Sequence, residues 1–181
     1  ILAICAKDRP ELESFFDYLQ SMAHVKLVLE KATPVDLSPY DVVISTDTSE
    51  GEEKIESLEQ FAAAGGGWLK LVYQSTRPLS EIFGVQPGHI GPAAELRVLF
   101  DDPDHPLATR LPDAIYLEGV YHPLELTAED TELILYADWH YQHFPMLVAR
   151  MAGKGKVACT TLQAYRHPVF QQILYRVVRY L

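Results

Sequence analysis

Apolar and polar positions between residues 40 and 72 follow two different periods in succession. A continuous apolar run at residues 42–44 is typical of a strand that is buried on both faces of a parallel sheet. Apolar residues at three- and four-residue spacing follow over residues 55–62, which is the pattern of one helix face. Glycines 65–67 end this helix, because glycine adopts the left-handed conformation without a steric cost. A second apolar run then completes a β-α-β unit, whose crossover we expect to be right-handed.

The rest of the chain extends this α/β pattern on both sides. Apolar runs at residues 1–5 and 25–30 predict strands on either side of a helix at residues 11–22. Extended runs are predicted at residues 96–100, 114–121, 133–137, 146–151 and 157–161, before a closing helix that begins at Pro168. This order predicts one α/β domain over residues 1–181, built as a three-layer sandwich around a mainly parallel central sheet.

One long segment, residues 74–92, is rich in glycine and proline and predicts little regular structure. Segments of this length inside a compact domain are usually functional or form a mobile cover. The sequence does not decide whether this segment is a lid.

Charge and cysteine content narrow the classes of partner. The formal net charge is −10, and a nucleic acid or an anionic membrane surface would require a basic face. No apolar run approaches the roughly 20 residues of a membrane-spanning helix. Cys5 and Cys159 both lie in apolar runs, which favours reduced thiols in the core of a cytoplasmic protein. We therefore expect a cytoplasmic protein with no nucleic-acid and no membrane partner.

A set of short motifs occurs in a recognisable order along the chain. They are YDVV at residues 40–43, GGG at 65–67, EGVY at 118–121, FPMLVA at 144–149 and GKGKV at 153–157. In this order and spacing, the chain from about residue 40 to residue 181 resembles the ThuA-like (trehalose-utilisation) family of the class I glutamine amidotransferase-like superfamily. The resemblance implies a flavodoxin-like fold and a role in carbohydrate metabolism, often the use of a disaccharide.

The chain departs from this family at positions that carry chemistry. The family usually has a histidine where this chain has Val72, and a Leu-Gly-His motif where it has Leu162, Gln163 and Ala164. True amidotransferases place a nucleophilic cysteine after the glycine-rich turn, and none stands near Tyr73. We therefore expect no glutaminase activity. The same losses favour an alternative, a non-catalytic binding or assembly module with a degenerate site.

The polar residues after the predicted strands are the candidate binding residues. Ligands of open α/β sheets bind beyond the carboxyl ends of parallel strands. Asp8, Tyr73, Gln74 and Gln163 follow such strands, and we expect them to bind substrate in a cleft. Their hydroxyl, amide and aromatic groups suit a sugar, which has hydroxyls at its edge and C–H groups at its faces. The other interpretation is a set of solvated loops with no ligand.

A possible acid–base group follows the strand at residues 114–121. His122 is the predicted proton carrier, because histidine titrates near neutral pH, and Glu118 or Tyr121 could orient it. We therefore take His122, Glu118 and Tyr121 as the candidate catalytic residues. The alternative is a histidine whose hydrogen bonds are satisfied at the end of a strand.

The segment DWHYQH at residues 138–143 is the densest histidine cluster. A zinc site needs three or four ligands, and this stretch is predicted to be a loop between strands. We therefore expect surface or partner-contact histidines, with no metal and no cofactor, although a metal-dependent hydrolase is a third reading. The aromatic residues Trp139, Tyr141 and Phe144 leave a homo-oligomer open, since aromatic loops often anchor interfaces.

Overall fold

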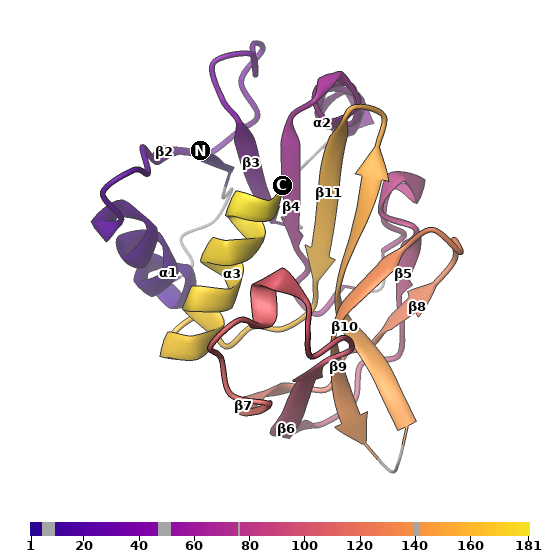
Figure 1. The fold of residues 1–181 in the computed structure, drawn as a ribbon. Helices are drawn as coiled ribbons and strands as arrows, with labels where there is room; N and C mark the ends of the chain where they lie inside the picture. Colours follow the sequence, from indigo (N-terminus) through magenta and orange to yellow (C-terminus); the bar gives the residue numbers. More distant parts are fainter. Residues whose placement is uncertain (5–9, 47–51, 76, 140–141) are drawn as a thin grey trace.

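The computed structural model describes residues 1–4, 10–46, 52–75, 77–139 and 142–181. Its central feature is a nine-stranded sheet, drawn in Figure 1, with the strand order β2-β1-β3-β4-β11-β10-β9-β6-β7. The strands are β1 (Leu2–Ile4), β2 (Val28–Glu30), β3 (Val42–Thr46), β4 (Gly67–Leu71), β6 (Ala93–Phe100), β7 (Ala114–Val120), β9 (Glu132–Trp139), β10 (Gln142–Ala152) and β11 (Gly155–Thr160).

The sheet has a parallel half and an antiparallel half. Every pairing from β2 to β11 is parallel, and every pairing from β11 to β7 is antiparallel. The α/β class is confirmed, but the expectation of a mainly parallel sheet holds for the first five strands only. The reason lies in the connections. β10 leads into β11 through residues 153 and 154 alone, and a parallel pair needs a crossover of about a dozen residues or more.

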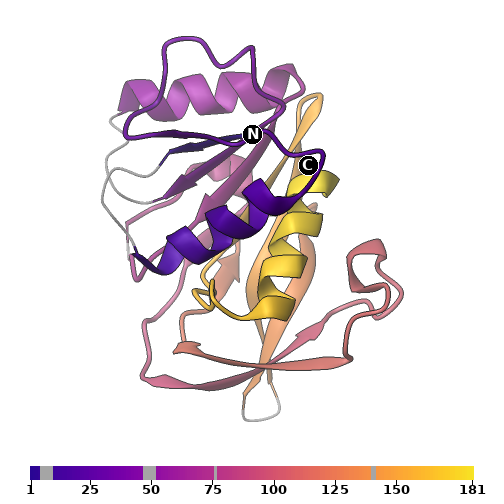
Figure 2. The ribbon, with the colours of Figure 1, turned by 90° about the vertical axis from the view of Figure 1, so that its left-hand side faces the viewer.

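Helices α1, α2 and α3 of the described residues complete the three layers. α1 (Pro10–Ser21) and α3 (Pro168–Tyr180) lie next to each other on one face of the sheet, and α2 (Glu52–Ala64) covers the other (Figure 2). Successive residues of β3 point alternately into the two cores that these helices cover. Val42 and Ile44 pack in the core under α1 and α3, whereas Val43 packs in the core under α2.

The predicted β-α-β unit is present as β3-α2-β4. Trp68, near the start of β4, fixes β4 against β3. Trp68 of β4 is 1% exposed, and its Nε1 donates to Ser45 Oγ of β3 at 2.8 Å. Its ring also packs edge-on against Phe83, with 4.6 Å between centroids. Gly65 has a φ of 123°, as expected of the glycine that ends α2.

The irregular segment after β4 is packed against the sheet. It contains the 3₁₀ turn η1 (Glu81–Phe83) and β5 (Val85–Pro87), and β5 pairs with β8 (Leu124–Leu126) in a second, two-stranded sheet. Phe83 and Val85 are buried in the core under α2. A further 3₁₀ turn, η2 (Pro106–Ala108), follows β6. Within the described residues, no helix combines the length and the apolar character that crossing a membrane requires.

Candidate functional site

A hollow of about 620 Å³ lies at the carboxyl edge of the parallel half, where β11 ends. We call it the Gln163 cleft. Its lining residues come from three regions: Glu11 of α1, Glu95, Tyr116 and Glu118 of β6 and β7, and residues 163–168 between β11 and α3. This is the edge at which ligands of open α/β sheets bind.

The connection from β11 to α3 forms one wall of the cleft and is fixed by hydrogen bonds. Thr160 Oγ1 donates to Met146 O at 2.9 Å, and Leu162 N donates to Thr160 Oγ1 at 3.2 Å. Farther on, the side chain of Gln171 donates to Tyr165 O at 2.8 Å, and the Tyr165 ring is buried against Phe170. Gln163 is therefore held on a fixed backbone between two anchored residues.

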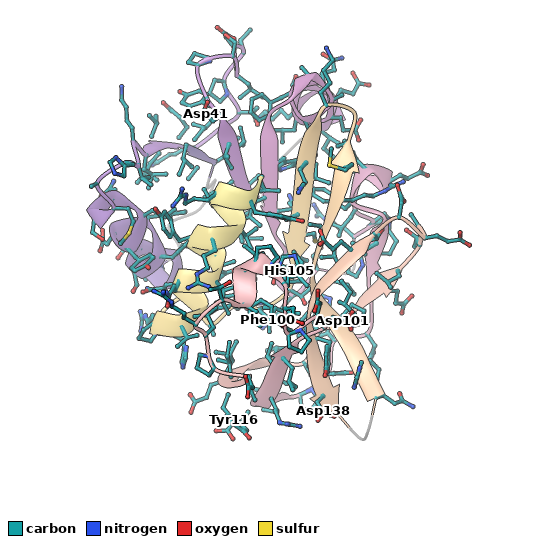
Figure 3. The ribbon with its side chains drawn as sticks, viewed as in Figure 1. Asp41, Phe100, Asp101, His105, Tyr116 and Asp138 are labelled. Carbon is teal, nitrogen blue, oxygen red and sulfur yellow. The ribbon has the colours of Figure 1, made fainter. Side chains whose placement is uncertain are left out.

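The opposite wall of the cleft is formed by the first residues of β6 and by β7. Glu95 and Glu118 are direct partners in the antiparallel register, so their side chains leave the same face with roughly 5 Å between the Cβ atoms. Tyr116, which Figure 3 labels on β7, is 56% exposed. Arg97 of β6 is ion-paired with Asp138 of β9. The wall therefore presents two carboxylates and one exposed aromatic ring.

Two side-chain nitrogens in the cleft lack partners among the described residues. Gln163 Nε2 and His167 Nδ1 are both buried, and neither makes a hydrogen bond. An unpaired buried polar group costs about 1–3 kcal/mol, which a ligand group or a water molecule would recover. Both side chains line the same hollow, so the cleft holds hydrogen-bonding capacity that the protein itself does not use.

The structure brings together two of the residues that the sequence singled out. Glu118 and Gln163 line the cleft from opposite walls. Tyr73 and Gln74 follow β4 and are not among its lining residues, although Gln74 is exposed and has an unusual φ of 40°. Asp8 lies outside the described residues.

The predicted contacts of His122 differ from those in the structure. Its side chain is 0% exposed, and neither ring nitrogen makes a hydrogen bond within the described residues. Glu118 and Tyr121 therefore do not orient it. Burial lowers the pKa of His122, because an apolar environment disfavours the imidazolium. The neighbouring Tyr121 ring packs edge-on against Phe144 at 5.4 Å, and burial raises its pKa.

The described residues contain no group of three or more histidine, cysteine, aspartate or glutamate side chains placed to hold a metal ion. Within the histidine-rich segment, His143 stacks on Tyr136 with 3.9 Å between ring centroids. His140 and Tyr141 lie outside the described residues, as does the Trp139 side chain.

Sequence reasoning missed Glu11, Glu95, Tyr116 and His167 as cleft residues. The predicted strand began at residue 96, whereas β6 begins at Ala93, so Glu95 fell outside it. The alternation of polar and apolar residues over 95–98 was the sequence signal that could have placed Glu95 in the strand. Glu95 and Arg97 are exposed, and Leu96 and Val98 between and beyond them are buried.

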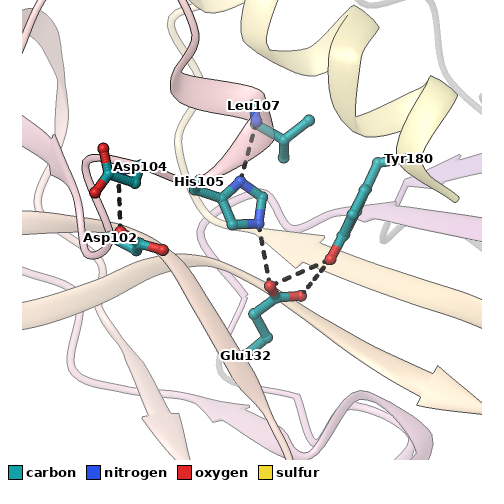
Figure 4. Close-up of polar contacts among 6 residues, drawn as sticks. All are labelled: Asp102, Asp104, His105, Leu107, Glu132 and Tyr180. Carbon is teal, nitrogen blue, oxygen red and sulfur yellow. Dashed lines mark hydrogen bonds and ion pairs between the residues drawn. The ribbon is translucent and has the colours of Figure 1, made fainter.

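A second polar cluster lies beneath η2 (Figure 4). His105 Nδ1 accepts from Leu107 N at 3.1 Å, so the proton is on Nε2, which donates to Glu132 Oε1 at 3.0 Å. The Tyr180 hydroxyl donates to Glu132 Oε2 at 2.9 Å. This network ties η2 to β9 and to the last turn of α3.

We expect the Tyr180 hydroxyl to make stability depend on alkaline pH. Burial first, and then the hydrogen bond and charge of Glu132, raise the pKa of Tyr180 to about 12. An unfolded tyrosine has a pKa of about 10, so the folded state favours the neutral phenol. This contribution is complete below pH 10 and is lost as the pH rises toward 12. Urea unfolding of Tyr180→Phe should therefore show a smaller loss of stability between pH 9 and 12 than the unchanged protein. Equal losses would contradict this assignment.

Solved structures of other proteins share the fold of this chain. No family model and no curated protein sequence matches the chain. A cytoplasmic protein from Salmonella typhimurium superposes with a TM-score of 0.74 at 15% identity, over 99% of this chain and 98% of that one. A protein described as ThuA-like, from Bacteroides uniformis, gives 0.70 at 14% identity, over 99% and 89%. A β-galactosidase from Bacillus circulans gives 0.74 at 17% identity, over 98% of this chain but only 30% of the enzyme.

Proposed function

We propose that this chain, which has the fold of ThuA-like proteins, binds a neutral sugar or sugar derivative in the Gln163 cleft and acts in carbohydrate metabolism. One observation carries the proposal. Two buried nitrogens without a partner among the described residues, and a cross-strand pair of carboxylates, line one hollow at the carboxyl edge of the parallel strands. A cytoplasmic setting is part of the proposal, because two of the similar Salmonella proteins are described as cytoplasmic.

The charge of the cleft favours a neutral ligand with many hydroxyls. Glu11, Glu95 and Glu118 line it, with Arg166 as the one arginine or lysine among the described lining residues. Carboxylates accept hydrogen bonds from sugar hydroxyls, and such charge-assisted bonds are about twice as strong as neutral ones. An anionic ligand would meet like charges there. The exposed face of Tyr116 offers a surface for the C–H face of a sugar ring.

The descriptions of the similar structures support the choice of ligand class. One group is described as ThuA-like, and another consists of β-galactosidases, of which this chain spans less than a third. We do not assign glycoside hydrolysis to the chain. Glutaminase activity is not part of the proposal either. Residues 73–75 after β4 are Tyr, Gln and Ser, and Cys159 is fully buried within β11.

The proposal predicts which residues control sugar affinity. A thermal-shift screen of neutral mono- and disaccharides should find one class that stabilises the protein, by about 2.7 kcal/mol at a hundred times its dissociation constant. With that sugar, calorimetry should show that Glu118→Gln and Gln163→Ala each weaken binding about tenfold. A hydrogen bond contributes roughly 0.5–1.5 kcal/mol for a neutral group such as the Gln163 amide and roughly 1.5–3 kcal/mol for a charged group such as the Glu118 carboxylate.

Glu129→Gln is the matched control, because it removes the same charge from an exposed residue outside the cleft. It should leave the affinity unchanged. A stabilising sugar whose affinity is the same in Glu118→Gln, Gln163→Ala and the control would overturn the assignment of the cleft. The absence of any stabilising sugar would count against the ligand class.

A further inference from the structure

A second hollow, of about 720 Å³, lies on the outer side of α1 and α3 beside η2. Figure 2 shows the two helices next to each other on this side. We call this second hollow the arginine pocket. Its lining residues are Tyr18, Met22, Pro106, Leu107, Thr109, Arg110, Gln172, Tyr175, Arg176, Arg179 and Tyr180. It shares no lining residue with the Gln163 cleft.

The charge of this pocket is opposite to that of the whole protein. Three arginines line it and no aspartate or glutamate is among its described lining residues, although the chain carries a formal net charge of −10. Arg179 alone would be explained by the dipole at the carboxyl end of α3. Arg110 follows η2, and Arg176 lies a turn earlier in α3, so the dipole does not account for the set.

Two hydrogen bonds hold the guanidinium of Arg176 in a fixed orientation, and both are made by Nη1. Its Nη1 donates to Leu107 O and to Thr109 O, both at 2.7 Å. Those two bonds use both protons of Nη1. A guanidinium has five N–H donors, and the Nε–H and the Nη2 pair of Arg176 make no hydrogen bond to another described residue. That edge has the geometry that binds two oxygens of a phosphate or carboxylate at once.

Arg110 has a strained backbone at the rim of the pocket. Its φ is 59°, in the left-handed region that residues with a side chain rarely adopt. Arg110 lies inside the turn that the hydrogen bond from Leu111 N to Ala108 O closes at 2.9 Å, and Thr109 Oγ1 donates to Pro106 O at 3.1 Å just before it. Strained residues of this kind cluster at ligand sites, because the surrounding structure must hold them.

Tyrosine rings form the remaining walls. The rings of Tyr18 and Tyr175 meet edge to face at 6.3 Å. Tyr180 is held by its bond to Glu132 and by Lys156 Nζ, which lies 3.4 Å from the ring centroid. The tyrosine rings therefore stand in fixed positions beside the three arginines, of which Arg110 and Arg179 are exposed to solvent.

From these observations we propose that the arginine pocket binds a small oxyanion, namely phosphate or the phosphate group of a phosphate monoester. Arg176 supplies the bidentate contact, and Arg110 and Arg179 supply the additional positive charge. The site is independent of sugar binding in the Gln163 cleft, whose carboxylates repel such an anion.

The test measures binding of inorganic phosphate and of a hexose phosphate by calorimetry at constant ionic strength. Both should bind the unchanged protein, and Arg110→Gln and Arg179→Gln should each weaken binding about tenfold. Arg176→Lys keeps the charge but loses the bidentate edge, and it should also weaken binding. Arg77→Gln, which removes an exposed arginine outside the pocket, should leave the affinity unchanged.

Two results would overturn the proposal. One is the absence of phosphate binding by the folded, unchanged protein. The other is phosphate binding that Arg110→Gln and Arg179→Gln reduce no more than Arg77→Gln does. The arginine variants should leave the affinity for a neutral sugar intact, so failure of either site can be recognised separately.

Discussion

Replacing Trp68 with alanine is expected to lower the free energy of unfolding by about 3–5 kcal/mol. Trp68 is among the largest fully buried side chains, and its ring packs on Phe83 at 4.6 Å. The change removes this packing and leaves a cavity in the core under α2. It also leaves the fully buried hydroxyl of Ser45 without the indole donor at 2.8 Å. Urea unfolding followed by circular dichroism measures the loss.

Trp68→Phe separates the contribution of ring packing from that of the indole hydrogen bond to Ser45. It keeps an aromatic ring against Phe83 but removes the indole N–H, so the loss should fall to about 1–3 kcal/mol. If Trp68→Ala cost no more than Trp68→Phe, the packing of β4 against η1 would not have the importance assigned to it here.

Gly155→Ala is expected to destabilise the protein by about 3 kcal/mol through overpacking. A Cβ at this position would lie 2.2 Å from Gly66 O and 2.4 Å from Ala62 O. Both are backbone atoms, one in the last turn of α2 and one just after it, so no side-chain rotation relieves the contact. The strain would separate the start of β11 from α2, and equilibrium unfolding in urea would show a lower midpoint.

Gly119→Ala is the matched control for this prediction. A Cβ at Gly119 on β7 meets no atom within 4 Å, so this variant should keep the stability of the unchanged protein to within about 0.5 kcal/mol. Equal stability of the Gly155 and Gly119 variants would show that β11 does not approach α2 as closely as described.

The centre of the parallel half could be predicted from the sequence because β1, β3 and β4 are buried on both faces. Residues 42–44 form an unbroken apolar run, and the helix that follows has one apolar stripe. The antiparallel half is harder to predict, because its partners depend on the lengths of the connections. The two-residue turn at 153–154 determines that β10 and β11 form a hairpin.

The candidate site was only partly predictable for a related reason. Gln163 and Glu118 stood out because they lie at strand ends or in a motif. Glu95 becomes a cleft residue only through its cross-strand pairing with Glu118, which no local pattern reveals. His167 could not be predicted as a cleft residue either, because its position depends on how the chain enters α3. His122 was misleading because a histidine that follows a tyrosine and lies near a glutamate in the sequence can still be buried without a hydrogen bond to either, as here among the described residues.

The claim that the Gln163 cleft binds a sugar can be tested most directly by nitrogen-15 NMR. Gln163 Nε2 is buried and has no hydrogen-bond partner among the described residues, so its side-chain amide resonance reports directly on any ligand that reaches the cleft. Titration with the stabilising sugar should shift this resonance together with the backbone amides of residues 164–167. If those resonances stay in place while the amides of residues 73–75 or of the arginine pocket shift, the sugar binds elsewhere and the central claim is wrong.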